Sequence, residues 1–309
     1  MRAGGAGDAV MLALVALLAG TGIAALWSAS SGYAVSIGKG AGYFALRQAL
    51  FLAPAALIFW ACSALDLDRL RSKIGILTLG SLGALLLPFL PLLGETRNGA
   101  TRWIDLGVTT FQPSELWKPV MILYLAHILD RKGERIAESP GVLVPPFILA
   151  AAGCLLVFAQ NDFSSAALSI LAAAVVFWAA SAPPSFFLGL GAAAASLSAL
   201  SILTSDFRLR RILAFLFPAY EPHGQSYQVL GSLRAIRSGG LLGKGLGLGT
   251  LKTGGIPEVQ SDFIFAAWAE ETGLLGVLAV MAAWGALGWR AFKVALAEED
   301  RFRSCLGFG

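Results

Sequence analysis

Long apolar stretches, separated by short charged or Gly/Pro-rich breaks, make up most of this chain. Runs of about 17 to 25 apolar residues are long enough to cross a bilayer as helices. Eight stretches are predicted to do so, with approximate ranges 9–28, 48–65, 74–93, 114–129, 141–159, 164–181, 185–203 and 262–289. They lack the alternating pattern of an outer-membrane barrel. The pattern therefore predicts an all-α integral membrane protein, built as a polytopic helical bundle.

Composition agrees with this prediction, because the 309 residues are 57% hydrophobic and 14% charged, whereas soluble domains carry about 25% charged residues. No stretch remains for a separate soluble domain, so residues 1–309 are predicted to form one transmembrane domain. The first apolar run has no clear small-residue cleavage pattern, which favours an uncleaved helix over a signal peptide. Cys62, Cys154 and Cys305 are scattered along the chain, which predicts neither a disulfide nor a metal site.

Basic residues in the short loops predict the orientation. The loops DLDRLRSK (66–73) and DRKGERIAE (130–138) each carry three basic residues, and such loops stay in the cytoplasm. The N-terminus is therefore predicted to be cytoplasmic, and the basic residues that follow the last run fall on the same side. Residues 204–261 then form a long extracytoplasmic loop between the seventh and eighth helices. Its length favours a functional role over a linker.

Two motifs in this loop bear on phosphate binding. In GGLLGKGLGLG, Lys244 is followed by Gly245, where a P-loop needs Ser or Thr, and no βαβ context is present. We interpret the segment as a glycine-rich loop that turns tightly and approaches other helices, with backbone contacts to a phosphate left open. In FRLRRILAF, Arg208, Arg210 and Arg211 suit phosphate recognition, although anionic head groups attract arginine equally.

Ionisable residues also stand at several predicted helix starts. Glu115 follows Pro-Ser and can stabilise the positive end of a helix. Glu115 and Lys118 also share one helical face, and an ionisable pair entering a membrane normally faces a bundle interior or a polar cavity. Both interpretations of Glu115 stay open. Trp103 is placed at the outer membrane interface, and Asp162 in QNDFSS is interpreted as a helix cap.

Asp262 is the sharpest single candidate for chemistry. It stands where the long loop meets the last apolar run, in SDFIFAAWAEE. Partial desolvation there would raise the pKa of its carboxyl and make it a better general base, whereas the alternative role is an ordinary N-cap. Glu270 and Glu271 lie too deep in the predicted helix to cap it, so we expect them to face a cavity or to be paired.

Taken together, the motifs resemble the SEDS family (shape, elongation, division and sporulation) of bacterial cell-wall polymerases, which includes FtsW, RodA and SpoVE. The resemblance spans nearly the whole chain in order. It rests on LWSASS, the Arg47-Gln48 pair, NGATRWIDLG, QPSELWK, QNDFSS, FRLRRILAFLFP, SYQVLGSLRAIRSGGLLGKGLGLG and IPEVQSDFIFAAWAEETGLLG. Any one of these motifs is weak, but the ordered set is highly specific.

The resemblance implies a glycosyltransferase that polymerises lipid II on the outer face of the bacterial cytoplasmic membrane and releases undecaprenyl diphosphate. The family's essential aspartate falls on Asp262, which implies a role as general base or organiser of the acceptor. The family's cavity Glu, Lys and Trp fall on Glu115, Lys118 and Trp103, and Arg102 stands in the same motif as Trp103. Arg211, Lys252 and Glu258 also lie within matching motifs, and their contact with diphosphate or sugar is our hypothesis. A divalent cation, Mg²⁺ or Mn²⁺, is plausible beside the leaving group, but the sequence has no dedicated metal site.

Within the family, SYQV and the preceding FPAYEPHG are more similar to division-type FtsW than to elongation-type RodA. The partners implied are a class B penicillin-binding transpeptidase, other divisome proteins and the membrane, with no nucleic acid. The principal alternatives are a lipid II flippase, a RodA-like elongation polymerase, or a scaffold that only recruits the transpeptidase.

Three departures from the family pattern affect these expectations. Asn161 and Ser164-Ser165 replace the usual residues around Asp162, and Gln260 and Ser261 replace the usual histidine and threonine before Asp262. The chain also ends where family members continue into two further helices. The activity of the 309-residue form by itself is therefore an open question.

Overall fold

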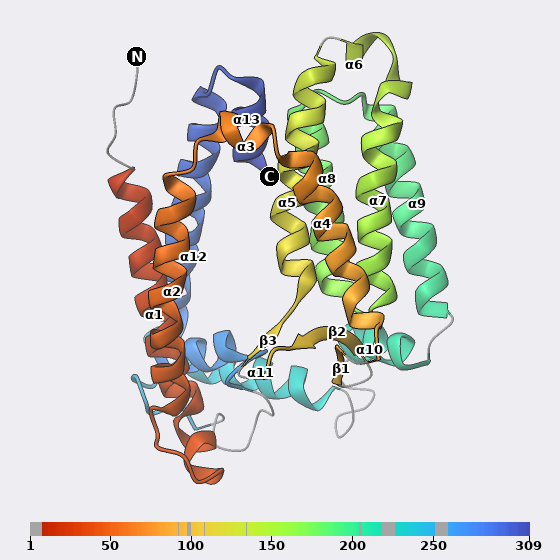
Figure 1. Cartoon of the computed structure of the whole chain (residues 1–309). Helices are drawn as coiled ribbons and strands as arrows, with labels where there is room; N and C mark the ends of the chain where they lie inside the picture. Colours follow the sequence, from red (N-terminus) through yellow and green to blue (C-terminus); the bar gives the residue numbers. More distant parts are fainter. Residues whose placement is uncertain are drawn as a thin grey trace. The chain divides into compact units, whose positions relative to one another are not determined.

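The computed structural model describes residues 8–91, 93–97, 100–107, 109–133, 135–203, 206–217, 226–250 and 259–309 (Figure 1). The chain divides into two compact units, each assembled from two separate segments. The first unit combines Met1–Ala64 with Ala194–Arg290, and the second combines Leu65–Ala193 with Ala291–Gly309.

The first unit is built around three long helices, α1 (Ala9–Ser36), α2 (Tyr43–Ser63) and α12 (Ile264–Ala297), the last of which continues past Arg290 into the second unit. Nearly all side chains of α2 are exposed, and those of α1 are exposed or half-buried except for Ala29, Ser30 and Ala34, as expected for helices that face lipid. The side chain of Asp8 caps α1, accepting hydrogen bonds from the backbone N–H groups of Val10 and Met11. Arg290 of α12 also donates to Asp8 and, chiefly through this hydrogen bond, holds the pKa of that carboxyl below its ordinary value.

The second unit packs a helical core beside a small sheet. Its elements are α3 (Leu67–Arg71), α4 (Ile74–Leu86), η1 (Leu87–Phe89), α5 (Pro113–Lys132), α6 (Arg135–Glu138), η2 (Pro140–Leu143), α7 (Val144–Ala159), α8 (Phe163–Ala179) and α13 (Arg301–Phe308). Trp117, Met121 and Leu125 on α5, together with Phe177 on α8 and Phe302 on α13, are almost fully buried in this core. The apolar face of α5 therefore holds the unit together. Helix α9 (Pro184–Leu203) begins in this unit and ends in the first.

Each of the eight predicted spanning segments corresponds to a helix, which confirms the predicted fold class. Among the described residues, four helical stretches are long and apolar enough to cross a membrane: Ala9–Ser36, Tyr43–Ser63, Gly141–Ala159 and Ile264–Ala297. Ile74–Phe89, Phe163–Ala179 and Pro184–Ser196 are shorter apolar helices. Helix α1 runs past the predicted end into a serine-rich stretch, in which the hydroxyls of Ser31 and Ser36 donate to carbonyls one turn earlier.

Two regions predicted as loops contain regular structure. Residues 94–113 hold three antiparallel strands in the order β1 (Gly94–Arg97), β2 (Ala100–Asp105) and β3 (Thr110–Phe111). The strands are too short to give a clear alternating signal, which is why the sequence pattern missed them. The described part of 204–261 contains α10 (Asp206–Leu216) and α11 (Tyr227–Gly239). In both helices, arginines and apolar residues such as leucine and isoleucine each recur at helical spacing, and this signal was present in the sequence.

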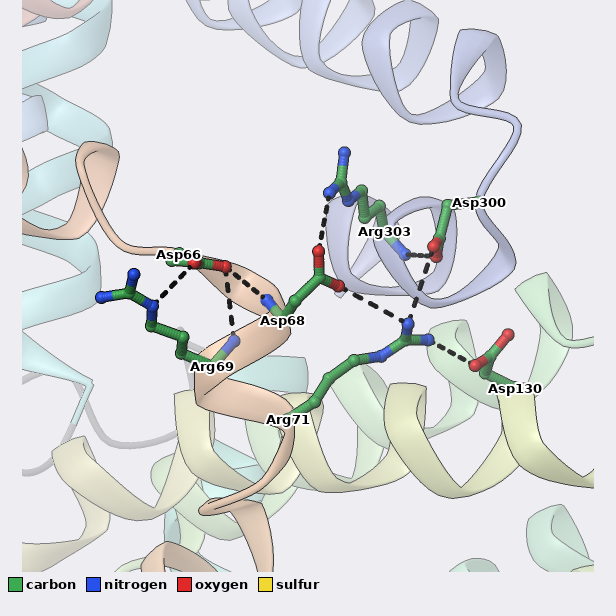
Figure 2. A network of polar contacts seen from close by, with 7 residues as sticks. All are labelled: Asp66, Asp68, Arg69, Arg71, Asp130, Asp300 and Arg303. Atoms are coloured by element: carbon green, nitrogen blue, oxygen red, sulfur yellow. Dashed lines mark hydrogen bonds and ion pairs between the residues drawn. The ribbon is translucent and has the colours of Figure 1, made fainter.

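One arginine joins three elements of the second unit (Figure 2). Arg71 of α3 lies 2.5 Å from a carboxylate oxygen of Asp130, at the end of α5, and 3.7 Å from one of Asp300, before α13. Its guanidinium also lies 4.3 Å from the ring centroid of Phe302. Arg303 reaches Asp68 at 3.7 Å from the α13 side. These contacts fix the short helix α13 against the bundle.

Candidate functional site

Asp262 lies in the turn that leads into α12, and its side chain is exposed. The first helical residue is Ile264, and the N–H groups of Ala266 and Ala267 donate to the carbonyl of Phe263. Phe263 therefore occupies the N-cap position, and no described residue forms a hydrogen bond or ion pair with the Asp262 carboxylate. The capping interpretation of Asp262 is wrong for this reason. The carboxylate is solvent-accessible within the described chain, and its partial desolvation at the membrane boundary stays a prediction.

Glu115 and Lys118 form the ion pair that their spacing predicts. Both belong to the first turns of α5, and Lys118 Nζ lies 2.8 Å from Glu115 Oε1. The lysine side chain is 17% exposed, while the glutamate side chain is 57% exposed. The Glu115 carboxylate is therefore half-exposed at the start of α5, whereas the Lys118 side chain is mostly buried within the second unit.

Arg102 and Trp103 are positioned by strand β2. Trp103 pairs with Glu95 of β1 in the antiparallel register. Arg102 Nη1 lies 3.3 Å from Asp162 Oδ1, and Gln112 donates to the other carboxylate oxygen. Asp162 is almost fully buried and also accepts from the N–H of Ser165 as the N-cap of α8. The predicted cap role of Asp162 is confirmed, and the same carboxylate also anchors the sheet to α8.

We expect Asp162→Ala to lower the stability of the protein by about 2 kcal/mol, because it removes a helix cap and leaves two polar partners unsatisfied. Thermal unfolding of the detergent-solubilised protein measures the change. Asp105→Ala is the matched control, since Asp105 is an exposed aspartate on β2, the strand that also carries Arg102, and its carboxylate bonds only the N–H of Gly107 among the described residues. Equal destabilisation by both variants would contradict the anchoring role.

The remaining predicted site residues are less completely described. Lys252 and Glu258 lie outside the described residues, as does the side chain of Arg211, whose backbone belongs to α10. Asp262 belongs to the first unit, whereas Glu115, Lys118, Arg102 and Trp103 belong to the second. The structure pairs Glu115 with Lys118 and Arg102 with Asp162, and the joining of the two groups into one cavity stays a prediction.

Glu270 is paired inside the first unit, as expected for an acid deep in a helix. It is fully buried, and its Oε1 lies 2.6 Å from Lys244 Nζ. The same oxygen accepts from the backbone N–H of Thr250 at 3.0 Å and from its hydroxyl at 3.1 Å. The Ser238 hydroxyl adds a longer bond at 3.4 Å. Sequence reasoning missed Lys244 as the partner, because its Gly-Lys-Gly context was weighed only against nucleotide binding.

Glu271 is equally buried but faces different partners. The Ser28 hydroxyl of α1 lies 2.6 Å and 2.7 Å from its two carboxylate oxygens. The backbone N–H groups of Gly247 and Gly249 donate to it at 3.0 Å and 3.4 Å. The expectation that Glu270 and Glu271 are paired is therefore confirmed. The signal that could have found Ser28 is its place in the LWSASS motif.

The glycine-rich segment wraps closely around α12 at a break in that helix. Gly273 has φ +66° and interrupts the helical conformation. The N–H of Lys244 donates to the carbonyl of Glu270, and the N–H of Leu274 donates to the carbonyl of Gly240. A Cβ on Gly243, where φ is +78°, would lie 2.1 Å from the carbonyl oxygen of Glu271. The interpretation of this segment as a tightly turning loop that approaches another helix is confirmed.

Comparison with known proteins finds relatives that all belong to one family. The FtsW/RodA/SpoVE family, described as cell cycle proteins, matches residues 8–309. The chain is 33% identical over 302 residues to the Probable peptidoglycan glycosyltransferase FtsW of Geobacter sulfurreducens, covering 98% of this chain and 81% of that protein. It is 35% identical over 306 residues to the protein of the same name in Thioalkalivibrio sulfidiphilus, covering 96% and 75%. Stage V sporulation protein E of Bacillus subtilis is 30% identical over 302 residues, covering 98% and 82%.

Solved structures agree with these relatives. A chain from the structure described as "Structural coordination of polymerization and crosslinking by a peptidoglycan synthase complex" matches with a TM-score of 0.76 and 26% identity, covering 96% of this chain and 81% of that one. The rod shape determining protein RodA of Thermus thermophilus matches with a TM-score of 0.66 and 25% identity, covering 96% and 79%. The resemblance inferred from the motifs is thereby confirmed. On these matches, the chain belongs to the FtsW/RodA/SpoVE family of cell cycle proteins.

Proposed function

We propose that this protein is a peptidoglycan glycosyltransferase that polymerises lipid II at the outer face of the cytoplasmic membrane during cell division. Its family and its relatives named Probable peptidoglycan glycosyltransferase FtsW support this assignment. The single observation that carries it concerns Asp262. Its exposed carboxylate, just before α12, forms no hydrogen bond or ion pair with any described residue. A carboxylate with this freedom is available to an incoming hydroxyl group.

In the proposed reaction, the acceptor hydroxyl of one lipid-linked disaccharide attacks the anomeric carbon of the growing chain. A new glycosidic C–O bond forms, the C–O bond to the diphosphate breaks, and undecaprenyl diphosphate leaves with the bonding electrons. Asp262 accepts the proton of the attacking hydroxyl, or orients that hydroxyl, at its carboxylate. The carboxylate lies just before the N-terminal end of α12.

The cationic residues of the site are assigned to the diphosphate. Lys118 and Arg211 can balance its charge, with Lys252 and Glu258 as further contacts to diphosphate or sugar. Arg102 and Trp103 would line the substrate side of the sheet, with Arg102 held in place by Asp162. Among the described residues, no three His, Cys, Asp or Glu side chains gather as a metal site. The chain's own cationic side chains can supply charge neutralisation, and a divalent cation beside the diphosphate stays a separate prediction.

A class B penicillin-binding transpeptidase is the proposed partner. The structural match to a chain of a complex that coordinates polymerisation and crosslinking supports this proposal. Lipid II, the membrane and other divisome proteins complete the proposed set. A glycan polymerase releases uncrosslinked strands, so a transpeptidase must consume its product.

Formation of glycan polymer from lipid II by the detergent-solubilised protein with its transpeptidase tests the assignment directly. Polymer is expected from the wild type. Absence of polymer, together with translocation of lipid II across the vesicle membrane, would contradict the polymerase assignment and indicate a flippase. The chain spans 81% of the length of its relative in Geobacter sulfurreducens. The same assay on a version extended to the length of that relative tests whether further helices are needed.

The proposed orientation, with a cytoplasmic N-terminus, predicts which loops a membrane-impermeant maleimide can label. Lys39 follows α1 and Arg69 belongs to α3, and both side chains are exposed. With Cys62 replaced by alanine, Lys39→Cys is expected to react in intact spheroplasts, and Arg69→Cys only after the membrane is permeabilised. The reverse pattern would invert the topology and place Asp262 on the wrong side for the proposed reaction.

A further inference from the structure

Two adjacent carboxylates in α12 tie the glycine-rich segment to the helix that Asp262 precedes. Glu270 and Glu271 are 0% and 2% exposed. Burial of two neighbouring acids is costly unless both are paired and hydrogen-bonded. Here, they receive bonds from Lys244, Gly247, Gly249 and Thr250 of one segment and from Ser28 and Ser238 outside it. We call Glu270, Glu271, Lys244 and Ser28 the dicarboxylate clamp.

The position of the clamp in the chain suggests what it holds. Thr250, the last clamped residue, precedes the segment that leads to Asp262. Glu270 and Glu271 follow Asp262 on α12, so the clamp joins the chain before Asp262 to the chain after it. The backbone bonds from Lys244 and Gly245 to the carbonyls of Glu270 and Glu271 reinforce the same connection. These bonds fix the chain at Thr250 and at Glu270, on either side of Asp262 in the sequence.

We infer that Glu270 and Glu271 are positioning residues for Asp262, acting through Lys244, Ser28 and the glycine-rich segment. This inference rests on the proposed function of Asp262. Neither glutamate needs to touch substrate, since their role is to fix the two sides of the loop that presents the reactive carboxylate. Small displacements of a catalytic group lower the rate of the chemical step without an equal loss of binding.

The clamp also borders an open groove of about 520 Å³ in the first unit. Ser28 and Gly247 line this groove together with Gly20, Trp27 and Leu246. Two of the lining residues therefore bond the carboxylate of Glu271 directly. Loss of the bonds to Glu271 is expected to displace Ser28 and Gly247 in the groove wall, and also the chain that precedes Asp262.

The test uses the isosteric variants Glu270→Gln and Glu271→Gln in the full 309-residue chain, with two readouts. Hydrogen–deuterium exchange of peptides covering Leu246 to Thr250 reports on the clamped amides, and lipid II polymerisation gives kcat and KM. We expect exchange about tenfold faster, because bonds to charged acceptors become bonds to neutral ones. We expect kcat to fall about tenfold with KM changed less than about twofold. Glu298→Gln, which neutralises an exposed carboxylate just after α12, should change neither readout.

Two gentler variants keep the test informative if a glutamine variant fails to fold. Ser28→Ala removes one donor to Glu271 and should raise exchange modestly, while Lys244→Arg keeps the charge beside Glu270 and should retain activity that Lys244→Met loses. Unchanged exchange in both glutamine variants would overturn the clamp, whether or not the wild type polymerises lipid II. Faster exchange with unchanged kcat would overturn the positioning role. A wild type without polymerase activity would instead refute the proposed function, and the exchange result would still stand.

Discussion

Asp262→Asn is expected to lower the rate of lipid II polymerisation at least about 100-fold, the contribution typical of a positioned general base. Asparagine keeps the size of the side chain but cannot accept the proton of the acceptor hydroxyl. The folded state should be unaffected, because Asp262 is exposed and no described residue bonds it. Polymer length and initial rate with detergent-solubilised protein measure the effect, and thermal unfolding checks the fold.

Asp206→Asn is the matched control for this prediction. Asp206 is also an exposed aspartate at the start of a helix of the first unit, α10. Its replacement should leave the polymerisation rate within about twofold, since exposed substitutions away from a site have small effects. If Asp262→Asn polymerised as fast as the wild type while lipid II translocation fell, the enzyme assignment would be replaced by a flippase. Normal growth of cells that carry the variant at the division site would favour a scaffold.

Gly273→Ala is expected to lower the stability by about 3 kcal/mol or more, because alanine is strained in this conformation. Gly273 has φ +66° and ψ −168°. A Cβ at this position would lie 2.3 Å from the backbone nitrogen of Gly243 and 2.6 Å from the carbonyl oxygen of Leu241. Both obstacles are backbone atoms, so they cannot rotate away. Thermal unfolding in detergent, read together with the fraction of monodisperse protein, measures the loss.

Gly285→Ala provides the comparison within the same helix. A Cβ at Gly285 meets nothing within 4 Å, and alanine favours the helical conformation by up to about 1 kcal/mol. This variant should be neutral or slightly stabilised. A Gly273→Ala protein as stable as Gly285→Ala would show that the helix break does not depend on glycine.

The sequence was sufficient for the features that depend on long, repeated patterns. The apolar runs predicted every long helix, and the spacing of Glu115 and Lys118 predicted their ion pair. Long-range partners were not predictable, because nothing in the local sequence pairs Lys244 with Glu270 or Ser28 with Glu271. The alternative capping role of Asp262 is wrong because the helix starts at Ile264, and a sequence pattern locates the first residue of a helix only to within one or two residues.

The contacts of α1 with α12 have a consequence for the bilayer around the protein. Asp8 bonds Arg290 near one end of the pair, and Ser28 bonds Glu271 near the other. Along α1, 20 residues separate Asp8 from Ser28, and along α12, 19 residues separate Glu271 from Arg290. At 1.5 Å per residue, each interval is about 30 Å, the thickness of the hydrocarbon core. The two helices are thus bonded to each other at two points whose separation along each helix is about one hydrocarbon thickness, and we expect them to tilt together when the thickness of the membrane changes.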